Sequence, residues 1–437
     1  MHPPYENQLF WHAGRRNFLR MQAAVTHQRR RLMDSNATEP APKDIISSMP
    51  DDVVAHILDR LPLQDAVKTG ILSRNWRFKW TMLTQLVFDE VFFRYLLETK
   101  RENRYGEIIS RLLLHLKGVI SKFVLYIDQQ TYPILEDEHI ANWILFLSRK
   151  GIKDLIIQNI LDQPLKLPTH LFTCVELKHL KLVNCCFDPP ASFHGFPNLL
   201  SLELSRVQNE SKKLGEFFSR CPVLEILTMG FTFSAHEVKL AEIAKLTNLK
   251  ILSLYLRNFE KCMITSPDGI FELLGFLPKL QELRLDFLQC KSFTEDGAKK
   301  RSPTTFPCLK TLDLSYIDLG SGIVLSFAFE IIRSSWNLQT LEIMTGQQDV
   351  HPPPAICSPE VDYNTVGFLQ LQRVTFTSSM ASENEVCLIK YLLACSPFLK
   401  EIFLYPHLFV ARDEQLMFAK KLLKLHRASP VAEICFF

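Results

Sequence analysis

One six-residue pattern recurs through most of the chain after residue 120: L-x-x-L-x-L, with Ile, Val, Met or Phe allowed at the apolar positions. Chance does not place one hexamer this often at near-even intervals, so the chain is expected to be a stack of similar units. Each unit would bury its apolar face only against its neighbours. Ten copies end at Ile157, Leu182, Leu204, Met229, Leu254, Leu285, Leu314, Ile343, Phe376 and Leu404, with successive copies 22 to 33 residues apart.

This pattern and period are typical of leucine-rich repeats with some insertions. The last two apolar positions of each copy flank one residue, so on a strand both would face the core. Helices are expected on the opposite side, for example at 269–277, 325–334 and 384–394. The fold class predicted is therefore an α/β solenoid, a horseshoe of leucine-rich repeats over residues 120–365. Residues 366–437 are expected to hold the last repeats and a cap, made of a helix at 414–426 and a strand at 432–437.

The residues that alternate with the strand leucines are expected to form the concave face of the solenoid. They are mixed in charge and include a few aromatic side chains, which suits protein recognition better than nucleic acid, where a basic stripe would be expected. Most single positions are expected to be solvated strand surface with no particular role. The candidates for binding a target protein are Tyr255, Arg284, Asp286 and Tyr405.

Residues 44–90 form a separate helical segment. Ser48 is predicted as the N-cap of its first helix, with Pro50 near the first helical position and Asp51 reaching back as in a capping box. Pro62 is expected to end this helix. Its apolar residues recur at helical spacing and predict one continuous face. They are Val53, Val54, Ile57, Leu58 and Leu61.

Two further helices are predicted in this segment. The second covers residues 64–69 and ends at Gly70. In the third, Leu72, Trp76 and Trp80 stand four residues apart and would line one side. Three helices in under fifty residues cannot easily bury this many large apolar groups. The spacing leaves open whether the apolar face packs on the next domain or binds a partner.

The run "IISSMPDDVVAHILDRLPLQDAVKTGILSRNWRFKW", Ile45 to Trp80, resembles an F-box of the plant type. The departures are Met49 where Leu is usual, Asp52 where Glu is common and Asn75 where a basic residue is frequent. The resemblance implies that the segment binds a Skp1-like adaptor and, through it, a cullin scaffold. The adaptor-binding residues that it implies are Met49, Pro50, Val53, Ile57, Leu58, Leu61, Leu72 and Trp76.

Two later stretches extend the resemblance to all of the chain but the first 43 residues. "LIKYLLACSPFLKEIFL" with "AKKLLKLHRASPVAEICFF" is similar to the FBD domain of plant F-box/leucine-rich-repeat proteins, and "LPTHLFTCVELKHLKL" is similar to their entry repeat. The resemblance implies a substrate-recognition subunit of an SCF-type E3 ubiquitin ligase. The alternative is a non-catalytic repeat scaffold that acts outside any ligase. The sequence names neither the target nor a signal that would control its recognition.

The residue types that catalysis or cofactor binding would need are not arranged for it. The chain has no C-x-x-C pair, no G-x-x-x-x-G-K-[ST] phosphate loop and no H-E-x-x-H motif. A net charge of +3 gives no reason to expect nucleic acid or a membrane as partner. Cys174, Cys221 and Cys308 are predicted to be small buried apolar residues. We therefore expect no enzyme activity, no metal and no cofactor.

The first 43 residues differ from the rest, with six arginines and one acid up to residue 31. A nuclear signal at 29–31, an Arg-rich transit peptide and a disordered leader are the three readings, and the disordered leader is preferred. The chain lacks the apolar run of a secretory signal, and its cysteines are expected to be reduced thiols. The expected location is the nucleus, the cytoplasm or both.

Overall fold

The computed structural model describes residues 48–101, 104–128, 137–209, 214–230, 240–256, 267–288, 305–346, 369–378, 382–406 and 412–437. The predictions for the first 43 residues therefore lie outside the described residues. The chain forms two compact units, residues 1–160 and residues 161–437.

The first unit combines the expected helices with three parallel strands. β1 pairs with β2 and β2 with β3, and β1 lies inside the segment assigned to the helical module. The alternating positions Leu86, Phe123 and Leu155 are register partners, and all three are buried. The elements are α2 (Asp51–Leu58), α3 (Leu63–Lys68), η2 (Thr69–Ile71), η3 (Lys79–Met82), β1 (Gln85–Phe88), α4 (Glu90–Glu98), α5 (Tyr105–His115), β2 (Lys122–Ile127), α6 (Asp137–Ser148) and β3 (Asp154–Asn159).

The start of α2 differs from the prediction. The N-cap is Pro50, which makes no side-chain capping hydrogen bond, so the prediction of Ser48 as N-cap and of a capping box is wrong. Asp51 and Asp52 still lie in the first turn, where carboxylates suit the positive end of the helix dipole. The carboxylate of Asp51 accepts a hydrogen bond from Lys79 Nζ at 2.6 Å, which ties the start of α2 to η3.

The predicted third helix is not a regular helix. The chain forms the 3-10 helix η2, turns over residues 74–78, and forms the second 3-10 helix η3. Gly70 lies inside η2 and does not end a helix. A Cβ at Gly70 would lie 3.0 Å from the carbonyl oxygen of Arg77, so the chain folds back closely on itself here. Because of this turn, Leu72, Trp76 and Trp80 do not share one face.

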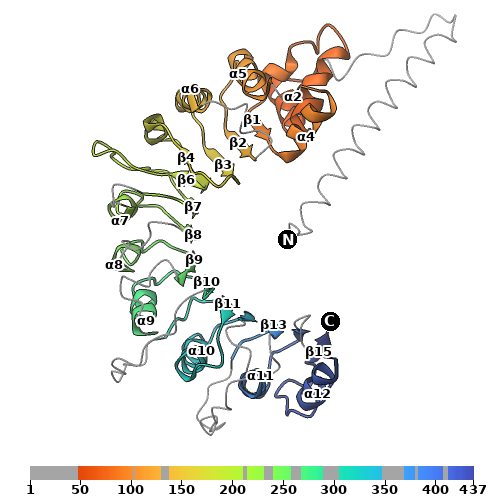
Figure 1. The fold of residues 1–437 in the computed structure, drawn as a ribbon, viewed down its shortest axis with the longest axis vertical. Coiled ribbons are helices and arrows are strands. Elements are labelled where there is room, and N and C mark those ends of the chain that lie inside the picture. The colour runs from red at the N-terminus through yellow and green to blue at the C-terminus, as the bar shows by residue number, and fades with distance from the viewer. Residues whose placement is uncertain are drawn as a thin grey trace, which may run out of the picture. The chain divides into compact units, whose positions relative to one another are not determined.

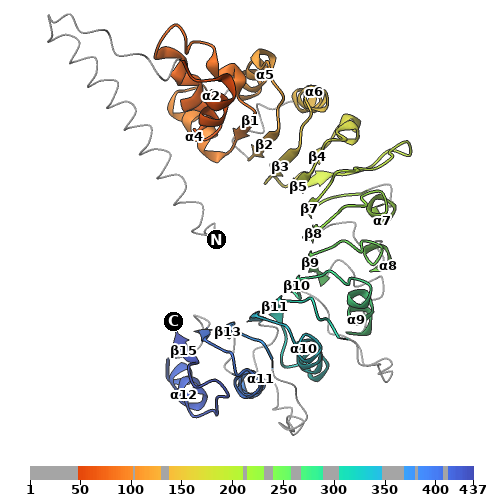
Figure 2. The ribbon, with the colours of Figure 1, turned by 180° about the vertical axis from the view of Figure 1, so that it is seen from behind.

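The second unit is the predicted solenoid. Its long sheet is parallel throughout, in the order β5-β7-β8-β9-β10-β11-β12-β13-β14-β15. The strands line the inner side of a curved array, and α7 to α12 lie on the outer side (Figure 1). The view from behind shows the same two layers (Figure 2). The strands are β4 (Leu165–Lys166), β5 (His179–Val183), β6 (Cys185–Cys186), β7 (Ser201–Ser205), β8 (Ile226–Met229), β9 (Ile251–Tyr255), β10 (Glu282–Asp286), β11 (Thr311–Ile317), β12 (Thr340–Thr345), β13 (Arg373–Ser378), β14 (Glu401–Pro406) and β15 (Glu433–Phe436).

The helices of this unit confirm the predicted outer layer, with ends that differ by a few residues. α11 begins at a capping box, in which Ser382 accepts from the backbone N–H of Glu385 and the Glu385 carboxylate accepts from the N–H of Ser382. The helices are η6 (Thr169–Thr173), α7 (Leu214–Phe218), α8 (Leu240–Ile243), α9 (Pro267–Gly275), α10 (Gly322–Ser334), α11 (Glu383–Cys395) and α12 (Arg412–Leu423).

The repeat hexamer accounts for the core of the second unit. Both strand positions of every copy are buried and at most 2% exposed, from Leu180 and Leu182 on β5 to Ile402 and Leu404 on β14. Asparagine side chains join neighbouring repeats just before the motif. Asn198 donates to the carbonyl oxygen of Val175 at 3.2 Å, Asn248 to that of Pro222 at 3.0 Å, and Asn337 to that of Pro307 at 2.7 Å. The sequence-predicted fold class is confirmed.

Candidate functional site

The predicted apolar face of α2 divides into core and surface. Val54 and Leu58, one turn apart, are 1% and 0% exposed, whereas Val53 is exposed and Ile57 and Leu61 are half-buried. Trp76 is also buried, at 4% exposed. Leu58 and Trp76 therefore pack in the core of the first unit and expose almost no side-chain surface. Their part in adaptor binding stays a prediction.

The other predicted adaptor-binding residues keep some exposed surface. Pro50 and Val53 are exposed at the start of α2, Met49 is half-buried beside them, and Leu72 is exposed after η2. The ion pair between Asp51 and Lys79 brings the start of α2 to the segment that begins η3.

Two residues that the sequence reading missed are the most exposed apolar side chains of residues 48–90. Ile71 is 85% exposed and Phe78 is 62% exposed. The predicted stripe consists of Leu72, Trp76 and Trp80, which stand four residues apart. Neither Ile71 nor Phe78 stands four residues from any of them, so both lie off this stripe. For Phe78 the sequence held a signal, because a large apolar residue between two basic ones, Arg77 and Lys79, favours an exposed position. Ile71, between Gly70 and Leu72, carried no such signal.

The Asp59 carboxylate, at the end of α2, is hydrogen-bonded to the residues that follow η3. Its Oδ1 accepts from the backbone N–H of Thr84 at 2.9 Å and of Gln85 at 3.1 Å, and its Oδ2 accepts from Thr84 Oγ1 at 2.6 Å. These bonds fix the residues after η3 to the end of α2. The apolar side chains from Val53 to Phe78 are therefore presented on a braced segment, as a preformed binding surface requires.

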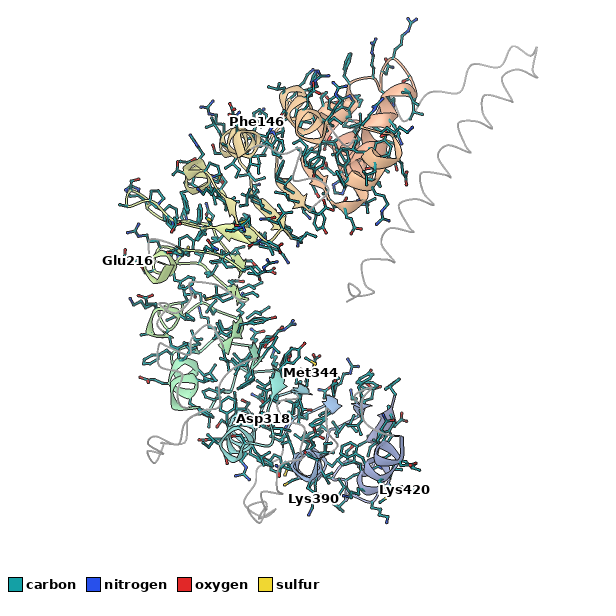
Figure 3. All side chains as sticks on the ribbon, viewed as in Figure 1. Phe146, Glu216, Asp318, Met344, Lys390 and Lys420 are labelled. Atoms are coloured by element: carbon teal, nitrogen blue, oxygen red, sulfur yellow. The ribbon has the colours of Figure 1, made fainter. Side chains whose placement is uncertain are left out.

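The second candidate surface is the strand face of the second unit. The outward positions of neighbouring strands lie in register, so Tyr255, Asp286 and Ser315 form one row and Arg284 and Asp313 lie in the next. Figure 3 shows Met344, which continues the first row, on the strand side of the unit, and Glu216 and Lys390 on the helix side. The predicted concave face is confirmed as a set of side chains in register.

The four predicted target-binding residues do not form one cluster. Tyr255, Arg284 and Asp286 lie together on β9 and β10, whereas Tyr405 lies on β14, four strands from β10. At the usual strand spacing this is about 19 Å. Tyr405 is 39% exposed, and its ring stacks on Phe437 with centroids 5.0 Å apart.

The local electrostatics of the β9–β10 residues come mainly from burial. Burial raises the pKa of Asp286, which accepts hydrogen bonds from the backbone N–H of Leu288 and from the side chain of Tyr255. Burial and the neighbouring Asp286 raise the pKa of Tyr255. Arg284 forms an ion pair with Glu282 on its own strand, Nη2 to Oε1 at 2.6 Å.

The described cysteines with the largest burial are not activated thiols. Burial raises the pKa of Cys174 and of Cys221 to about 12, so both thiols stay protonated and are poor nucleophiles. Cys308 is exposed, so the prediction that it is buried is wrong; it occupies the turn before β11, outside the core pattern. Asp89, half-buried in the first unit, caps α4 by accepting from the N–H of Phe92.

Within the described ranges no group of three or more His, Cys, Asp or Glu side chains could hold a metal ion. No described helix has both the length and the apolar character that crossing a membrane requires.

Comparison with known proteins gives two family matches. Residues 46–86 match the F-box domain, and residues 140–265 match a family described as FBD-associated F-box protein At5g56370, LRR repeats. The F-box match includes Ile71 and Phe78.

Two plant relatives agree with these matches. The F-box/FBD/LRR-repeat protein At1g13570 of Arabidopsis thaliana is 30% identical over 425 residues, covering 90% of this chain and 98% of the relative. The putative F-box/LRR-repeat protein At4g15060 of the same plant is 25% identical and covers 78% of this chain and 90% of the relative. Among solved structures, the leucine-rich-repeat protein LegL7 of Legionella pneumophila covers 87% of this chain and 88% of that chain, at 11% identity and a TM-score of 0.27.

Proposed function

Because the chain belongs to the F-box/FBD/leucine-rich-repeat family, we propose that it is the substrate-recognition subunit of an SCF-type E3 ubiquitin ligase. The family supports a general role as substrate adaptor of a ubiquitin ligase, and F-box domains generally bind Skp1-like adaptors. F-box and leucine-rich-repeat proteins are generally non-catalytic, and we extend this to the present chain.

The observation that carries the proposal is the surplus of apolar surface on the F-box segment. Ile71 and Phe78 leave apolar area in water, where it does not stabilise the fold, and a partner that covered both side chains would gain the free energy of burying them. With Val53 and Leu72 they form the adaptor surface in this proposal, and Met49, Pro50, Ile57 and Leu61 flank it. The adaptor would in turn hold a cullin scaffold.

The strand face of the second unit is the target-binding surface in the proposal. Its side chains lie in register over many strands, and such a face can bury a standard interface of roughly 1,600 Å². Affinity in such interfaces concentrates in a few aromatic and arginine residues. We retain Tyr255, Arg284, Asp286 and Tyr405 as candidates, and we place the complex in the nucleus, the cytoplasm or both.

The test is quantitative proteomics of cells that express wild type, an Ile71→Asp variant or a Tyr255→Ala, Arg284→Ala, Tyr405→Ala variant. We expect proteins depleted by wild type to recover in both variants. The Skp1-like adaptor and cullin should co-purify with wild type and the triple variant only. A scaffold that acts outside any ligase would bind partners through the strand face without cullin and without depletion of any protein.

A further inference from the structure

The strand face of β10, β11 and β12 has an excess of negative charge. Four carboxylates face outward here against one guanidinium, that of Arg284, which is already paired with Glu282. None of the other three carboxylates forms an ion pair with a described residue. They are Asp286, Asp313 and Glu342.

Two of these carboxylates directly oppose each other. Asp313 on β11 and Glu342 on β12 are register partners, and neighbouring strands lie about 4.8 Å apart. Like charges in this position repel and destabilise a sheet. Asp313 accepts a hydrogen bond from Ser315 Oγ at 2.7 Å, which holds the carboxylate but does not neutralise it. A cationic group from another molecule would remove the repulsion.

Two tyrosines that interact electrostatically with each other lie in the neighbouring strands, Tyr255 on β9 and Tyr316 on β11. Tyr255 is hydrogen-bonded to Asp286, and a bulge in β11 adds Tyr316, whose φ is +57°, between the paired residues Ser315 and Ile317. The bulge requires glycine at position 346, where a Cβ would lie 2.7 Å from the carbonyl oxygen of Tyr316. Bulges often re-aim a side chain at a binding site, and phenol faces attract ammonium and guanidinium groups.

We propose that this strand face, centred on Asp313 and Glu342, binds a basic segment of the target protein through its Arg and Lys side chains. The inference rests on the proposed function in that it takes the bound segment to belong to a ubiquitination target. Charge complementarity selects this occupant: a phosphate backbone would be repelled, and an apolar helix would desolvate carboxylates without pairing them.

The test uses the full chain co-expressed with a Skp1-like adaptor. Two fluorescently labelled probes of equal length, one built of Arg, Gly and Ser and one of Glu, Gly and Ser, are titrated by anisotropy. We expect wild type to bind the Arg probe at least about tenfold more tightly than the Glu probe, with affinity that falls as salt rises.

The decisive variant is Asp313→Asn with Glu342→Gln, which keeps side-chain shape and removes both charges. It should weaken the Arg probe about tenfold or more and leave the melting temperature unchanged or higher, because the repulsion is gone. The matched control, Glu176→Gln with Glu216→Gln, removes two exposed charges away from the strand face; Figure 3 shows Glu216 on the helix side. Its affinity should equal that of wild type.

Equal weakening in both double variants would mean that only net charge matters and would overturn the proposal. Equal binding of the two probes by wild type would overturn it as well. Adaptor binding is measured on the same samples. If the adaptor binds but the Arg probe shows no preference, this inference fails alone; if the Arg probe binds and the adaptor does not, the proposed ligase function fails.

Discussion

The strands of the second unit and the helices of the F-box segment differ in how well the apolar pattern of their sequence predicts which side chains are buried. Along β5 to β14 every strand position predicted to face inward is buried, whereas of the predicted face of α2 only Val54 and Leu58 are fully covered. In a repeat, the neighbours of each strand are near-copies of itself, so one pattern fixes which side is covered. α2 has no copies, and its cover depends on how residues 69–82 fold back. An apolar pattern in a single-copy module therefore does not distinguish buried core positions from exposed ones.

The largest expected effect is the difference in stability between a variant of a buried residue and a variant of an exposed residue of the F-box segment. Leu58→Ala leaves a cavity in the core, and we expect it to cost about 2–5 kcal/mol in the free energy of unfolding. Ile71→Ala removes a side chain that is already in water and should stay within about 0.5 kcal/mol of wild type. Urea denaturation of both variants checks this. Equal losses would show that the division into core and surface is wrong.

Core and surface positions of the repeat provide the matching comparison in the second unit. Leu312→Ala in β11 should cost about 2–4 kcal/mol, because Leu312 is fully buried between neighbouring repeats. The adjacent residue Thr311 faces outward, so Thr311→Ala should change stability by less than about 0.5 kcal/mol. A mild Leu312→Ala variant would contradict the claim that the pattern reports burial strand by strand.

Most of the solenoid could be predicted because the pattern repeats, but parts of the two candidate surfaces could not. The positions of the strands and of the outer helices follow from the spacing of the repeats. The rows of outward side chains follow from the alternation of apolar and polar residues along each strand. The fold-back at Gly70 and the bulge at Tyr316 follow from close backbone contacts, Gly70 with Arg77 and Gly346 with Tyr316. Neither contact leaves a periodic trace. Ile71 was missed for this reason, since its exposure depends on the fold-back.

Asp59 tests whether the F-box surface is braced. Asp59→Ala removes the acceptor for the N–H groups of Thr84 and Gln85 and should cost about 1–3 kcal/mol. Asp52 is exposed in the first turn of α2 and provides the control, with Asp52→Ala expected to cost under about 1 kcal/mol. Thermal unfolding followed by circular dichroism distinguishes the two. If Asp59→Ala unfolds at the same temperature as wild type, the hydrogen bonds of Asp59 to Thr84 and Gln85 do not stabilise this segment.

The smallest effect concerns the N-terminal arginine-rich segment. Deleting residues 1–32 should leave the melting temperature and adaptor affinity unchanged, because the segment has no apolar period with which to join a core. Differential scanning fluorimetry and a pull-down of the adaptor compare the deletion with the full chain. A drop of several degrees would show that the segment packs on one of the two units.

The affinity of the full chain for a purified Skp1-like adaptor tests the central claim most directly. We predict that Ile71→Asp and Phe78→Asp each weaken binding by about 2–4 kcal/mol, which is roughly thirtyfold to a thousandfold, with no change in melting temperature. Leu114→Asp provides the control, because Leu114 is 77% exposed on α5, outside the F-box match. It should bind like wild type. Unchanged affinity of folded Ile71→Asp and Phe78→Asp variants would contradict the assignment of this surface to the adaptor.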